Sequence, residues 1–596
     1  MSTRPALIRQ RALYVLAGLA MGTALLSARL VYLQVFQANK LAAMAEAQRT
    51  KTIDLSAVRG EIVDRNHKEL AVSVDSYSIY ANPKDAKVLD ASRKEVKSFD
   101  RKATAAALAP ILGMGAPALE QKLQGNEFRW LVRQQPEAVR DKVRALKIPG
   151  LGLVREAKRI YPKGTLAATL IGFVGVDNQG LAGIENAFDK VLKGPPIKLQ
   201  VQVDAYGREI MREGPQAPMD TTLGDGNQVV LTIDENLQHI AERELAKTLE
   251  SSGAKRGTVL MMEPKTGNLV AFATLPTYDP NNFRNFSWEA IKNWAVTDVY
   301  EPGSTMKMFT LAGAVDNKRI GLEQKFKCPP YIKVEGRLIT DHEAPTWNRE
   351  LTPFDIMEVS SNVGTTQIAF TMKGAEHREF LTRMGFGSRT GSGITGESKG
   401  ILPALPWRPL TQATISFGQG VSVTALQILS AASALGNDGV RMEPRLIDSV
   451  LDSKGKVLQS FPPRSAGRVM KPETVKAMMK MLEKVVSTGT GVEAQVPGYR
   501  IAGKTGTAQK IADNGRGYSS DVEASFLGFF PSNDPRFVML TLLDSPRKVH
   551  WAAATAAPLF GHVAAETLRQ LGVRPTEPIN ANKPRPVPKA EHDDAH

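Results

Sequence analysis

The sequence has almost no cysteine, since Cys328 is the single cysteine among 596 residues. One cysteine excludes an intrachain disulfide and a cysteine-based zinc cage. The eight histidines include no His-Glu-x-x-His pattern, the helical zinc motif of metalloproteases. We therefore expect neither a catalytic metal nor a cofactor.

Acidic residues are in deficit, with 61 Asp and Glu against 76 Lys and Arg, and the formal charge is +15. This charge suits a polyanionic partner, such as nucleic acid, anionic lipid or a cell-wall polymer. The sequence lacks a basic run with interleaved aromatic residues and lacks a nucleic-acid-binding motif. No nucleic-acid partner is therefore expected, and the charge alone does not choose between the other two.

Long hydrophobic runs are absent except near the N-terminus. Residues 12–28 carry no charge, and after Arg29 the apolar run resumes as far as Phe36. The run 12–36 has about 25 residues, enough to span the hydrocarbon core of a bilayer. Arg29 would lie near one end, where its side chain can reach the headgroups. The sequence therefore predicts one transmembrane helix.

The flanking charges predict the orientation of this helix. Arg4, Arg9 and Arg11 precede the run, which favours a short cytoplasmic tail at 1–11 and a single-pass protein of the inner membrane. The rest of the chain would then lie in the periplasm. A cleaved signal peptide is the alternative, but its small-x-small site is poor because a bulky leucine lies two residues before the final alanine.

The region 37–225 has the pattern of short strands and helices with many charges. Its segment 92–142 has helical periodicity, and the charge run Arg93–Lys102 is typical of a solvated helix face. Arg59–Ser73 alternates apolar and polar residues and then turns, which predicts a hairpin.

From residue 226 the pattern changes to longer apolar elements. The expected elements are a strand at Val229–Asp234, a helix at 235–252, two strands around a turn at Pro264–Gly267, helices over about 304–440, strands within 499–543 and a helix at Ala552–Gln570. Strands at both ends with helices between them predict an α+β domain, with one antiparallel sheet flanked by helices. The proline-rich end, 573–596, predicts a disordered tail.

A serine with a lysine three residues later is a candidate nucleophile with its base, because one helical turn stacks the two side chains. The pattern occurs four times, at Ser252/Lys255, Ser304/Lys307, Ser453/Lys456 and Ser545/Lys548. Only Ser304 follows Pro-Gly and precedes an apolar-periodic helix. Its hydroxyl is therefore expected at a helix N-terminus, where backbone N–H groups favour negative charge. The alternative is that Ser304 is a plain N-cap.

Two further elements add polar groups to this candidate site. Ser360-Ser361-Asn362 is the single Ser-x-Asn of the chain, and a hydroxyl beside an amide can relay a proton and hold a peptide group. Its alternative is a turn or an Asn C-cap.

Lys-Thr-Gly occurs twice, and its context separates the two copies. Lys265-Thr266-Gly267 lies between two strands, which indicates a hairpin turn. Lys504-Thr505-Gly506 lies within a strand pattern, where a glycine indicates that another backbone comes close. A substrate along this strand would gain main-chain hydrogen bonds.

Together, Ser304-x-x-Lys307, Ser360-x-Asn362 and Lys504-Thr505-Gly506 form the set found in penicillin-binding proteins and class A β-lactamases. The chain also contains RGEIVDRNHKELA, RIYPKG, GFVG, GLAGIE, EPGSTMK, SSNVG, FGQG and AGKTGTAQK. On these segments it resembles the class B penicillin-binding proteins over about residues 12–570. It is most similar to their division-specific type, because Asn362 stands where the elongation type often has an aspartate.

The resemblance implies a penicillin-binding transpeptidase fold at 226–572, on an elongated mixed α/β pedestal of the dimerisation type at 37–225. The implied activity is that of a serine-type D-Ala–D-Ala transpeptidase, which cross-links peptidoglycan stem peptides at the division septum, releases D-Ala and is acylated by β-lactams. An elongation-type transpeptidase, a non-catalytic division scaffold and a β-lactam-binding receptor remain as alternatives.

For the reaction itself, the resemblance implies a nucleophile, a base and a proton relay. Ser304 would attack the D-Ala–D-Ala carbonyl, and a neutral Lys307 would take its proton. The ordinary lysine pKa of about 10.4 would have to fall toward ~7, through burial and through nearby Lys504. Ser360 would pass a proton to the leaving amine, and Asn362 would position the substrate amide.

The resemblance also implies how the substrate is held. Lys504, Thr505 and Thr507 would bind the terminal carboxylate, and Gly506 would form part of this substrate-binding strand. The backbone N–H groups of Ser304 and Thr507 would form the oxyanion hole.

Two absences bear on the alternatives. After Asn362 the chain has no Glu-x-x-x-Asn, which holds the deacylating water in class A β-lactamases, so transfer is favoured over hydrolysis. Residues 41–225 show no glycosyltransferase motif, so a separate membrane polymerase is expected as partner. In this family that is a SEDS glycosyltransferase, FtsW for the division type, together with other division proteins.

The charged residues of the first region have a simpler interpretation. Arg59, Gly60, Asp64 and Arg65 are expected to build a hairpin and a buried ion pair, and Glu185 is expected to be a structural carboxylate of the same kind. A role in partner coupling would rest on family analogy alone.

Overall fold

The computed structural model describes residues 4–55, 58–82, 88–89, 95–97, 99–125, 127–194, 197–202, 225–341, 348–511 and 517–578. The chain divides into two compact units. One unit comprises residues 1–57 and 195–225, and the other comprises residues 58–194 and 226–596.

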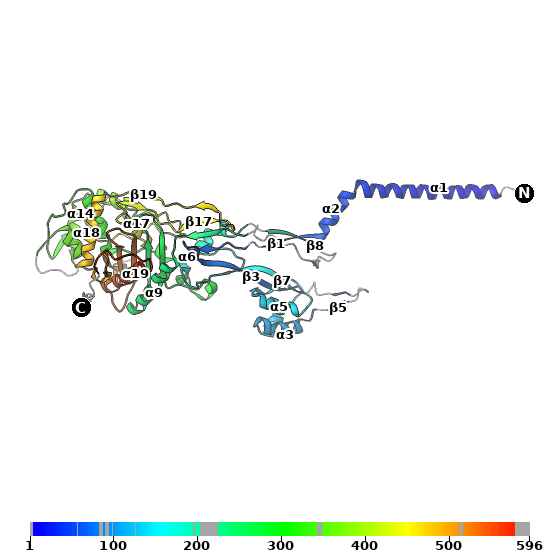
Figure 1. Cartoon of the computed structure of the whole chain (residues 1–596), viewed down its shortest axis with the longest axis horizontal. Helices are drawn as coiled ribbons and strands as arrows, with labels where there is room; N and C mark the ends of the chain where they lie inside the picture. Colours follow the sequence, from blue (N-terminus) through cyan, green and yellow to red (C-terminus); the bar gives the residue numbers. More distant parts are fainter. Residues whose placement is uncertain are drawn as a thin grey trace. The chain divides into compact units, whose positions relative to one another are not determined.

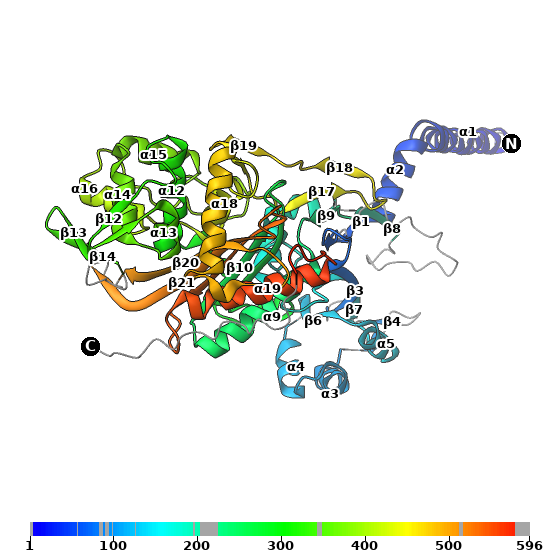
Figure 2. The ribbon, with the colours of Figure 1, turned by 60° about the vertical axis from the view of Figure 1, so that its left-hand side comes forward.

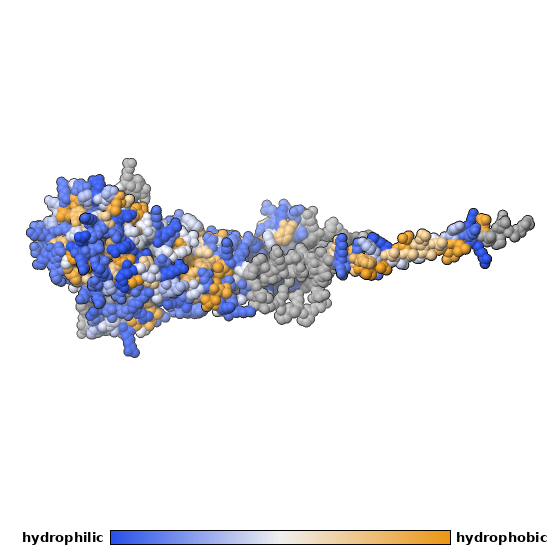
Figure 3. Space-filling view, turned by 90° about the horizontal axis from the view of Figure 1, so that it is seen from above, coloured by the Kyte–Doolittle hydropathy of each residue, from blue (hydrophilic) through white to orange (hydrophobic). Residues whose placement is uncertain are grey.

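The smaller unit begins with a long apolar helix. It consists of α1 (Arg4–Val31), a π-helical turn (Tyr32–Phe36), α2 (Ala38–Arg49) and the antiparallel strands β1 (Thr50–Leu55) and β8 (Ile197–Gln202). The leucines of α1 are exposed, and Figure 3 shows its largely hydrophobic surface. The helical segment Leu7–Phe36 is long and apolar enough to cross a membrane, which agrees with the predicted span at 12–36.

The larger unit contains a five-stranded antiparallel sheet (Figure 1). Its strands are β11 (Leu269–Leu275), β10 (Arg256–Met262), β22 (Phe537–Asp544), β21 (Tyr518–Phe530) and β20 (Ala502–Ile511), in that spatial order. This sheet confirms the predicted α+β transpeptidase fold. The strand that carries the second Lys-Thr-Gly, β20, lies at the edge of the sheet.

Helices cover both faces of this sheet. α9 (Glu235–Ser252) and α19 (Ala556–Gln570) pack on one face, where Figure 2 shows them side by side. The other face packs against α12 (Lys307–Asp316), α17 (Ala425–Ser433) and α18 (Pro472–Ser487). Successive residues of a strand point to opposite faces, so Val259 joins the first core and Leu260 the second. The central strands β10 and β22 and the second half of β21 are therefore buried.

The middle of the chain is helical, as predicted. It contains α10 (Trp288–Ile291), α11 (Trp294–Thr297), α13 (Pro353–Glu358), α14 (Asn362–Phe370), α15 (Gly374–Arg383), α16 (Pro409–Ser416) and three small antiparallel pairs: β12 (Phe326–Cys328) with β15 (Arg349–Leu351), β13 (Tyr331–Val334) with β14 (Arg337–Thr340) and β16 (Val440–Met442) with β19 (Ser465–Arg468).

A seven-stranded sheet joins the two predicted regions. Its strands are β18 (Val457–Ser460), β17 (Ile447–Leu451), β9 (Gln228–Leu231), β2 (Ile62–Val63), β3 (Glu69–Ala81), β6 (Arg129–Gln135) and β7 (Leu151–Ile160), with α6 (Ala168–Ile171), α7 (Gly183–Ala187) and α8 (Asp189–Leu192) nearby. The expected strand at 229–234 pairs here with β2 and β17 rather than with the five-stranded sheet. A strand pattern shows alternation but not which strand will pair with it.

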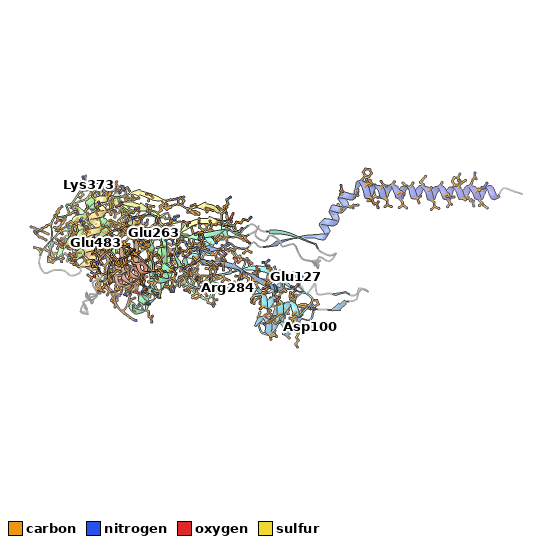
Figure 4. The ribbon with its side chains drawn as sticks, in the orientation of Figure 1. Asp100, Glu127, Glu263, Arg284, Lys373 and Glu483 are labelled. Atoms are coloured by element: carbon orange, nitrogen blue, oxygen red, sulfur yellow. The ribbon has the colours of Figure 1, made fainter. Side chains whose placement is uncertain are left out.

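The predicted helical character of 92–142 is wrong in part. The segment contains α3 (Arg101–Leu112), α4 (Ala116–Lys122) and α5 (Glu137–Ala145), but also β6 and the short strand β5 (Glu95–Lys97), which pairs with β4 (Val88–Leu89). Asp100, labelled in Figure 4, caps α3 by accepting a hydrogen bond from Ala103 N at 3.0 Å. The charge run therefore spans a strand and a helix start, and it is not one helix face.

The end of the chain is only partly described. Thr576 N and Glu577 N donate to Gly498 O, and Glu577 pairs with Arg500, so the first residues of the predicted disordered tail pack on the domain. The remainder of that tail, 579–596, lies outside the described residues.

A buried ionic cluster confirms the structural interpretation of Arg59 and Glu185. Glu185 is fully buried and accepts from Arg59 Nε at 2.6 Å and from Arg159 Nε at 2.7 Å. Arg59 also pairs with Asp189 at 2.7 Å. Two guanidinium groups thus share two carboxylates, and buried charges are tolerated only when they are paired in this way. The predicted hairpin also forms, as β2 and β3, with Asp64 accepting from the backbone of its turn.

We predict that Glu185→Gln destabilises the protein by about 3–5 kcal/mol, because it leaves two buried guanidinium groups with one carboxylate. The midpoint of thermal unfolding of the detergent-solubilised chain measures this. Asp75→Asn is the matched control, because its partner Arg155 is 54% exposed and such pairs contribute about 0–1 kcal/mol. Equal shifts for the two variants would contradict the structural role of the cluster.

Candidate active site

Ser304 lies in a tight turn before a buried helix. Gly303–Met306 is a 3-10 turn, and α12 begins at Lys307. Gly303 has φ +53°, a conformation that favours glycine. Pro302 is the N-cap residue of the 3-10 turn, and Met306 is the N-cap residue of α12. No side chain, that of Ser304 included, makes a capping hydrogen bond at either N-terminus. The alternative that Ser304 is a plain N-cap is therefore wrong.

The backbone of β20 touches this turn at Gly506. A Cβ atom on Gly506 would lie 2.9 Å from Pro302 O, and one on Gly303 would lie 3.1 Å from Thr507 O. Real Cβ atoms essentially never come within 3.0 Å of backbone, so only glycine at 506 lets β20 pack here, and the contact at Gly303 is tighter than most. The expectation that Gly506 marks a close backbone approach is confirmed.

A second backbone meets the turn from the Phe417–Gly420 loop. Gly303 N donates to Gly418 O at 3.1 Å, and a Cβ on Gly418 would lie 2.1 Å from Gly303 O. The segment that carries Ser304 is thus enclosed by two glycine-bearing backbones. This enclosure fixes where the half-buried Ser304 side chain can lie.

Lys307 is 1% exposed and contacts the turn between α13 and α14. Its Nζ donates to Ser360 O, and to Ser360 Oγ at 3.1 Å. Ser360 has φ +57°, a left-handed conformation that is uncommon for serine. Burial lowers the pKa of Lys307 to about 7, and the negative charge of Asp341 opposes this shift. A substantial share of Lys307 is therefore neutral near pH 7.

Lys504 is fully buried on β20, and its Nζ donates to Thr505 O at 3.1 Å and to Thr505 Oγ1 at 3.3 Å. Burial lowers the pKa of Lys504 well below its ordinary value, and the like charge of Lys307 lowers it further. The pKa of Lys307 is lowered by burial, without a contribution from Lys504. The repulsion expected between the two lysines therefore lowers the pKa of Lys504. Two ammonium groups in one dry site cannot both be charged without a counter-ion.

The rest of the Lys-Thr-Gly strand offers hydroxyl groups along the sheet edge. Thr505 Oγ1 lies 2.8 Å from Thr490 Oγ1. Thr507 Oγ1 accepts from Ala552 N at 3.2 Å, which leaves its proton available to an acceptor in the site. Lys504, Thr505 and Thr507 all lie on the edge strand β20, and their binding of a carboxylate stays a prediction.

Asp341 holds the Ser-x-Asn turn, and the sequence analysis missed it. Its carboxylate accepts from Ser361 Oγ at 2.8 Å and from Val363 N at 3.0 Å, and it pairs with Arg349 at 2.7 Å. Beside it, Asn362 Nδ2 donates to Thr340 O at 2.9 Å. Ser361, not Ser360, is the N-cap of α14. No local pattern marks Asp341, because its partners lie 8 to 22 residues along the chain.

The discarded copies of the motifs have structural roles. Ser252 Oγ donates to Thr248 O at 2.6 Å at the end of α9, and Ser545 Oγ donates to the adjacent Asp544 at 2.7 Å. The first Lys-Thr-Gly forms the turn between β10 and β11, where Thr266 Oγ1 donates to Glu263, labelled in Figure 4, at 2.8 Å. The expected hairpin turn is confirmed.

The described part of the chain contains no cluster of three or more His, Cys, Asp or Glu side chains with metal-binding geometry. The polar groups of the site are instead lysines, hydroxyls and amides. Such groups suit acyl transfer through a serine, with an anionic substrate group held by the lysines.

Known proteins share both regions of this chain. Residues 257–565 match the penicillin binding protein transpeptidase domain, and residues 54–231 match the penicillin-binding protein dimerisation domain. The chain is 33% identical over 558 residues to peptidoglycan D,D-transpeptidase FtsI of Escherichia coli K12, covering 93% of this chain and 90% of that protein. It is 32% identical over 583 residues to the probable peptidoglycan D,D-transpeptidase PenA of Neisseria gonorrhoeae, covering 97% and 96%.

Two solved structures are similar to this chain in fold and in sequence. Penicillin binding protein 3 of Mycobacterium tuberculosis, complexed with aztreonam, has a TM-score of 0.67 and 26% identity, covering 88% of this chain and 99% of that chain. A peptidoglycan synthetase from Bifidobacterium adolescentis has a TM-score of 0.68 and 29% identity, covering 89% and 98%.

We predict that Asp341→Asn lowers the pKa of Lys307 below its value of about 7, because the substitution removes the negative charge that opposes the effect of burial. Asparagine keeps the size of the side chain and an oxygen that can accept from Val363 N. Competitive acetylation of lysines across pH, read by mass spectrometry of the Lys307 peptide, measures this pKa. Asp75→Asn, at an exposed carboxylate, is the control. An unchanged or raised pKa of Lys307 in Asp341→Asn would contradict the electrostatic role of Asp341.

Proposed function

The chain belongs to the class B penicillin-binding proteins and is a peptidoglycan D,D-transpeptidase, and from this premise we propose that it cross-links stem peptides at the division septum through an acyl-enzyme on Ser304. One observation carries the assignment of the nucleophile. Ser304 lies in a turn enclosed by Gly418 and Gly506, and the buried Lys307 one turn later donates to Ser360. None of the other three Ser-x-x-Lys pairs has such surroundings.

Acylation begins with a proton transfer inside this site. Neutral Lys307 takes the proton of Ser304 Oγ as the oxygen attacks the carbonyl carbon of the penultimate D-Ala. The backbone N–H groups of Ser304 and Thr507 stabilise the oxyanion, each worth roughly 3–4 kcal/mol in comparable sites. Ser360, hydrogen bonded to Lys307, then gives its proton to the nitrogen of the leaving D-Ala and is reprotonated by Lys307. The bond to D-Ala breaks and an ester on Ser304 remains.

The terminal carboxylate of the donor peptide completes the charge balance. An adjacent anion favours the charged form of a lysine, so a carboxylate beside Lys504, Thr505 and Thr507 raises the depressed pKa of Lys504. The ammonium of Lys504 in turn disfavours a second positive charge on Lys307. Substrate binding therefore supports the neutral base that the reaction needs, and Asn362 holds the substrate amide beside it. The carboxylate of a β-lactam would bind in the same way.

Deacylation by an amine completes the transfer. The amine of a neighbouring stem peptide attacks the ester, and Ser360 relays its proton to Lys307. The ester bond to Ser304 Oγ breaks as the amide forms, and Lys307 returns the proton to Ser304 Oγ. The sequence after Asn362 has no Glu-x-x-x-Asn to hold a hydrolytic water, which supports transfer over hydrolysis. The relatives named FtsI and PenA support a transpeptidase over a receptor or a scaffold.

The setting of the reaction follows from the N-terminal helix and from the relatives. The segment Leu7–Phe36 would anchor the chain in the cytoplasmic membrane, with the arginines that precede it in the cytoplasm and the catalytic domain in the periplasm. The Ser-x-Asn at 360–362 and the FtsI relative support the division type. A SEDS glycosyltransferase, FtsW in the division type, would supply the glycan strands.

A donor thioester that ends as D-Ala–D-Ala does tests the reaction. We expect the detergent-solubilised chain to release the thiol and to form an amide with an added D-amino acid, at a rate that Ser304→Ala lowers at least about 1,000-fold. Ser252→Ala is the matched control, and we expect it to retain the wild-type rate. Release of free acid without amide, at any acceptor concentration, would identify a hydrolase. No turnover by a folded wild-type chain would leave the scaffold alternative.

The pKa of Lys307 sets the pH dependence of acylation. The base must be neutral, and its pKa is about 7, so the acylation rate constant is expected to fall about tenfold per pH unit below pH 7. Above pH 7 the rate levels off, because Lys307 is already deprotonated. Stopped-flow acylation by a fluorescent penicillin between pH 5 and 8.5 measures the profile. A rate that is flat down to pH 5 would exclude Lys307 as the base.

A further inference from the structure

Glu301 is a buried carboxylate three residues before Ser304, and the reaction described above does not use it. The residue is 6% exposed. Its Oε1 accepts from Gly420 N at 2.8 Å, and its Oε2 accepts from Tyr518 OH at 3.0 Å. One side chain therefore joins the Phe417–Gly420 loop and the start of β21 to the segment that carries the nucleophile.

Each partner of Glu301 belongs to an element that lines the Ser304 turn. In the Phe417–Gly420 loop, Gly418 O accepts a hydrogen bond from Gly303 N. Just after this loop, the backbones of Tyr300 and Val423 exchange two hydrogen bonds of 2.9 Å. Tyr518 opens β21, the strand that pairs with β20 along its length. Loss of the Glu301 side chain would remove its hydrogen bonds to Gly420 and Tyr518. The backbone hydrogen bonds between these elements would remain.

Among the described residues, no Lys, Arg or His forms an ion pair with the carboxylate of Glu301, and burial raises its pKa. Arg256 and Lys510 act on Glu523, and they pair with Asp298 and Asp544. Arg337 acts on Tyr518. Glu523 adds a further acidic group on the same side. A buried carboxylate needs hydrogen bonds in place of its lost hydration, so the position of Glu301 is tied to Gly420 and Tyr518.

We propose that Glu301 is a positioning residue, which holds the Phe417–Gly420 loop and the start of β21 against the Ser304 turn and so sets the rate of acylation. The inference rests on the proposed function, because it assigns Glu301 a role in acylation at Ser304. It predicts a defect in the chemical step rather than in the binding of the ligand. Glu301 touches no reacting atom, so its effect is exerted through the position of Ser304.

The test is the stopped-flow acylation of the full-length chain by a fluorescent penicillin, with the rate constant and the dissociation constant resolved. Glu301→Ala removes both hydrogen bonds and is expected to lower the acylation rate constant about 10- to 100-fold, with the dissociation constant within about threefold. Glu301→Gln keeps an acceptor for Gly420 N and an amide that can donate to the Tyr518 oxygen, so it is expected to stay within about threefold of wild type. Rescue by glutamine separates hydrogen bonding from charge.

Glu397→Ala is the matched control. Glu397 is equally buried at 6% and also accepts from a backbone N–H and a hydroxyl, Thr390 N at 2.7 Å and Ser392 Oγ at 3.2 Å, but in a loop that does not contact Ser304. It is expected to lower the thermal midpoint as Glu301→Ala does and to leave the acylation rate constant unchanged. An equal loss of the acylation rate constant in Glu397→Ala would mean that the loss in Glu301→Ala comes from lower overall stability. That result would overturn the proposal.

Tyr518→Phe keeps the test open if Glu301→Ala does not fold. It removes one of the two hydrogen bonds and is expected to lower the acylation rate constant about 5- to 10-fold. A wild-type rate constant in Tyr518→Phe, or in a folded Glu301→Ala, would overturn the positioning role. A folded wild-type chain that penicillin does not acylate would instead overturn the proposed function itself.

Discussion

The burial of two lysines, Lys307 and Lys504, in one site is the constraint on which the site depends. A lysine in a dry interior loses the hydration that stabilises its charge, and a second ammonium nearby raises the cost further. In this chain the pKa values of both lysines are depressed, that of Lys307 to about 7. A serine hydroxyl can give its proton only to an unprotonated group, so the burial that is costly for folding supplies the base that the chemistry requires.

The fold places these lysines together from distant parts of the chain. Lys504 is carried by the edge strand of a sheet that is covered by helices on both faces, and Lys307 is carried by a helix on one of those faces. Glycines at 303, 418 and 506 remove the side chains that would hold the three backbones apart. Asp341 and Arg349 then fix the Ser-x-Asn turn over Lys307. The sheet and its helices thus fix the positions of the two lysines, and the glycines allow the three backbones to pack closely.

The sequence predicts most of this arrangement, for identifiable reasons. Apolar periodicity predicts α9, α19 and the strands of the antiparallel sheet, and a glycine inside a strand pattern predicts the contact of Gly506 with another backbone. Pairing between distant segments is not encoded locally. The sequence therefore does not show that β9 joins β2, that Glu95–Lys97 is a strand, or that Asp341 lies under the Ser-x-Asn turn. It also does not show that Tyr518 reaches Glu301 across 217 residues.

The most direct test of the account is the covalent labelling of the full-length chain by a fluorescent penicillin, followed by peptide mapping of the adduct. We expect one labelled peptide, the one that contains Ser304, with an adduct that persists for hours. The label is predicted to disappear in Ser304→Ala and to remain in Ser453→Ala. Label on another serine, or label that turns over in seconds in the wild-type chain, would contradict the account.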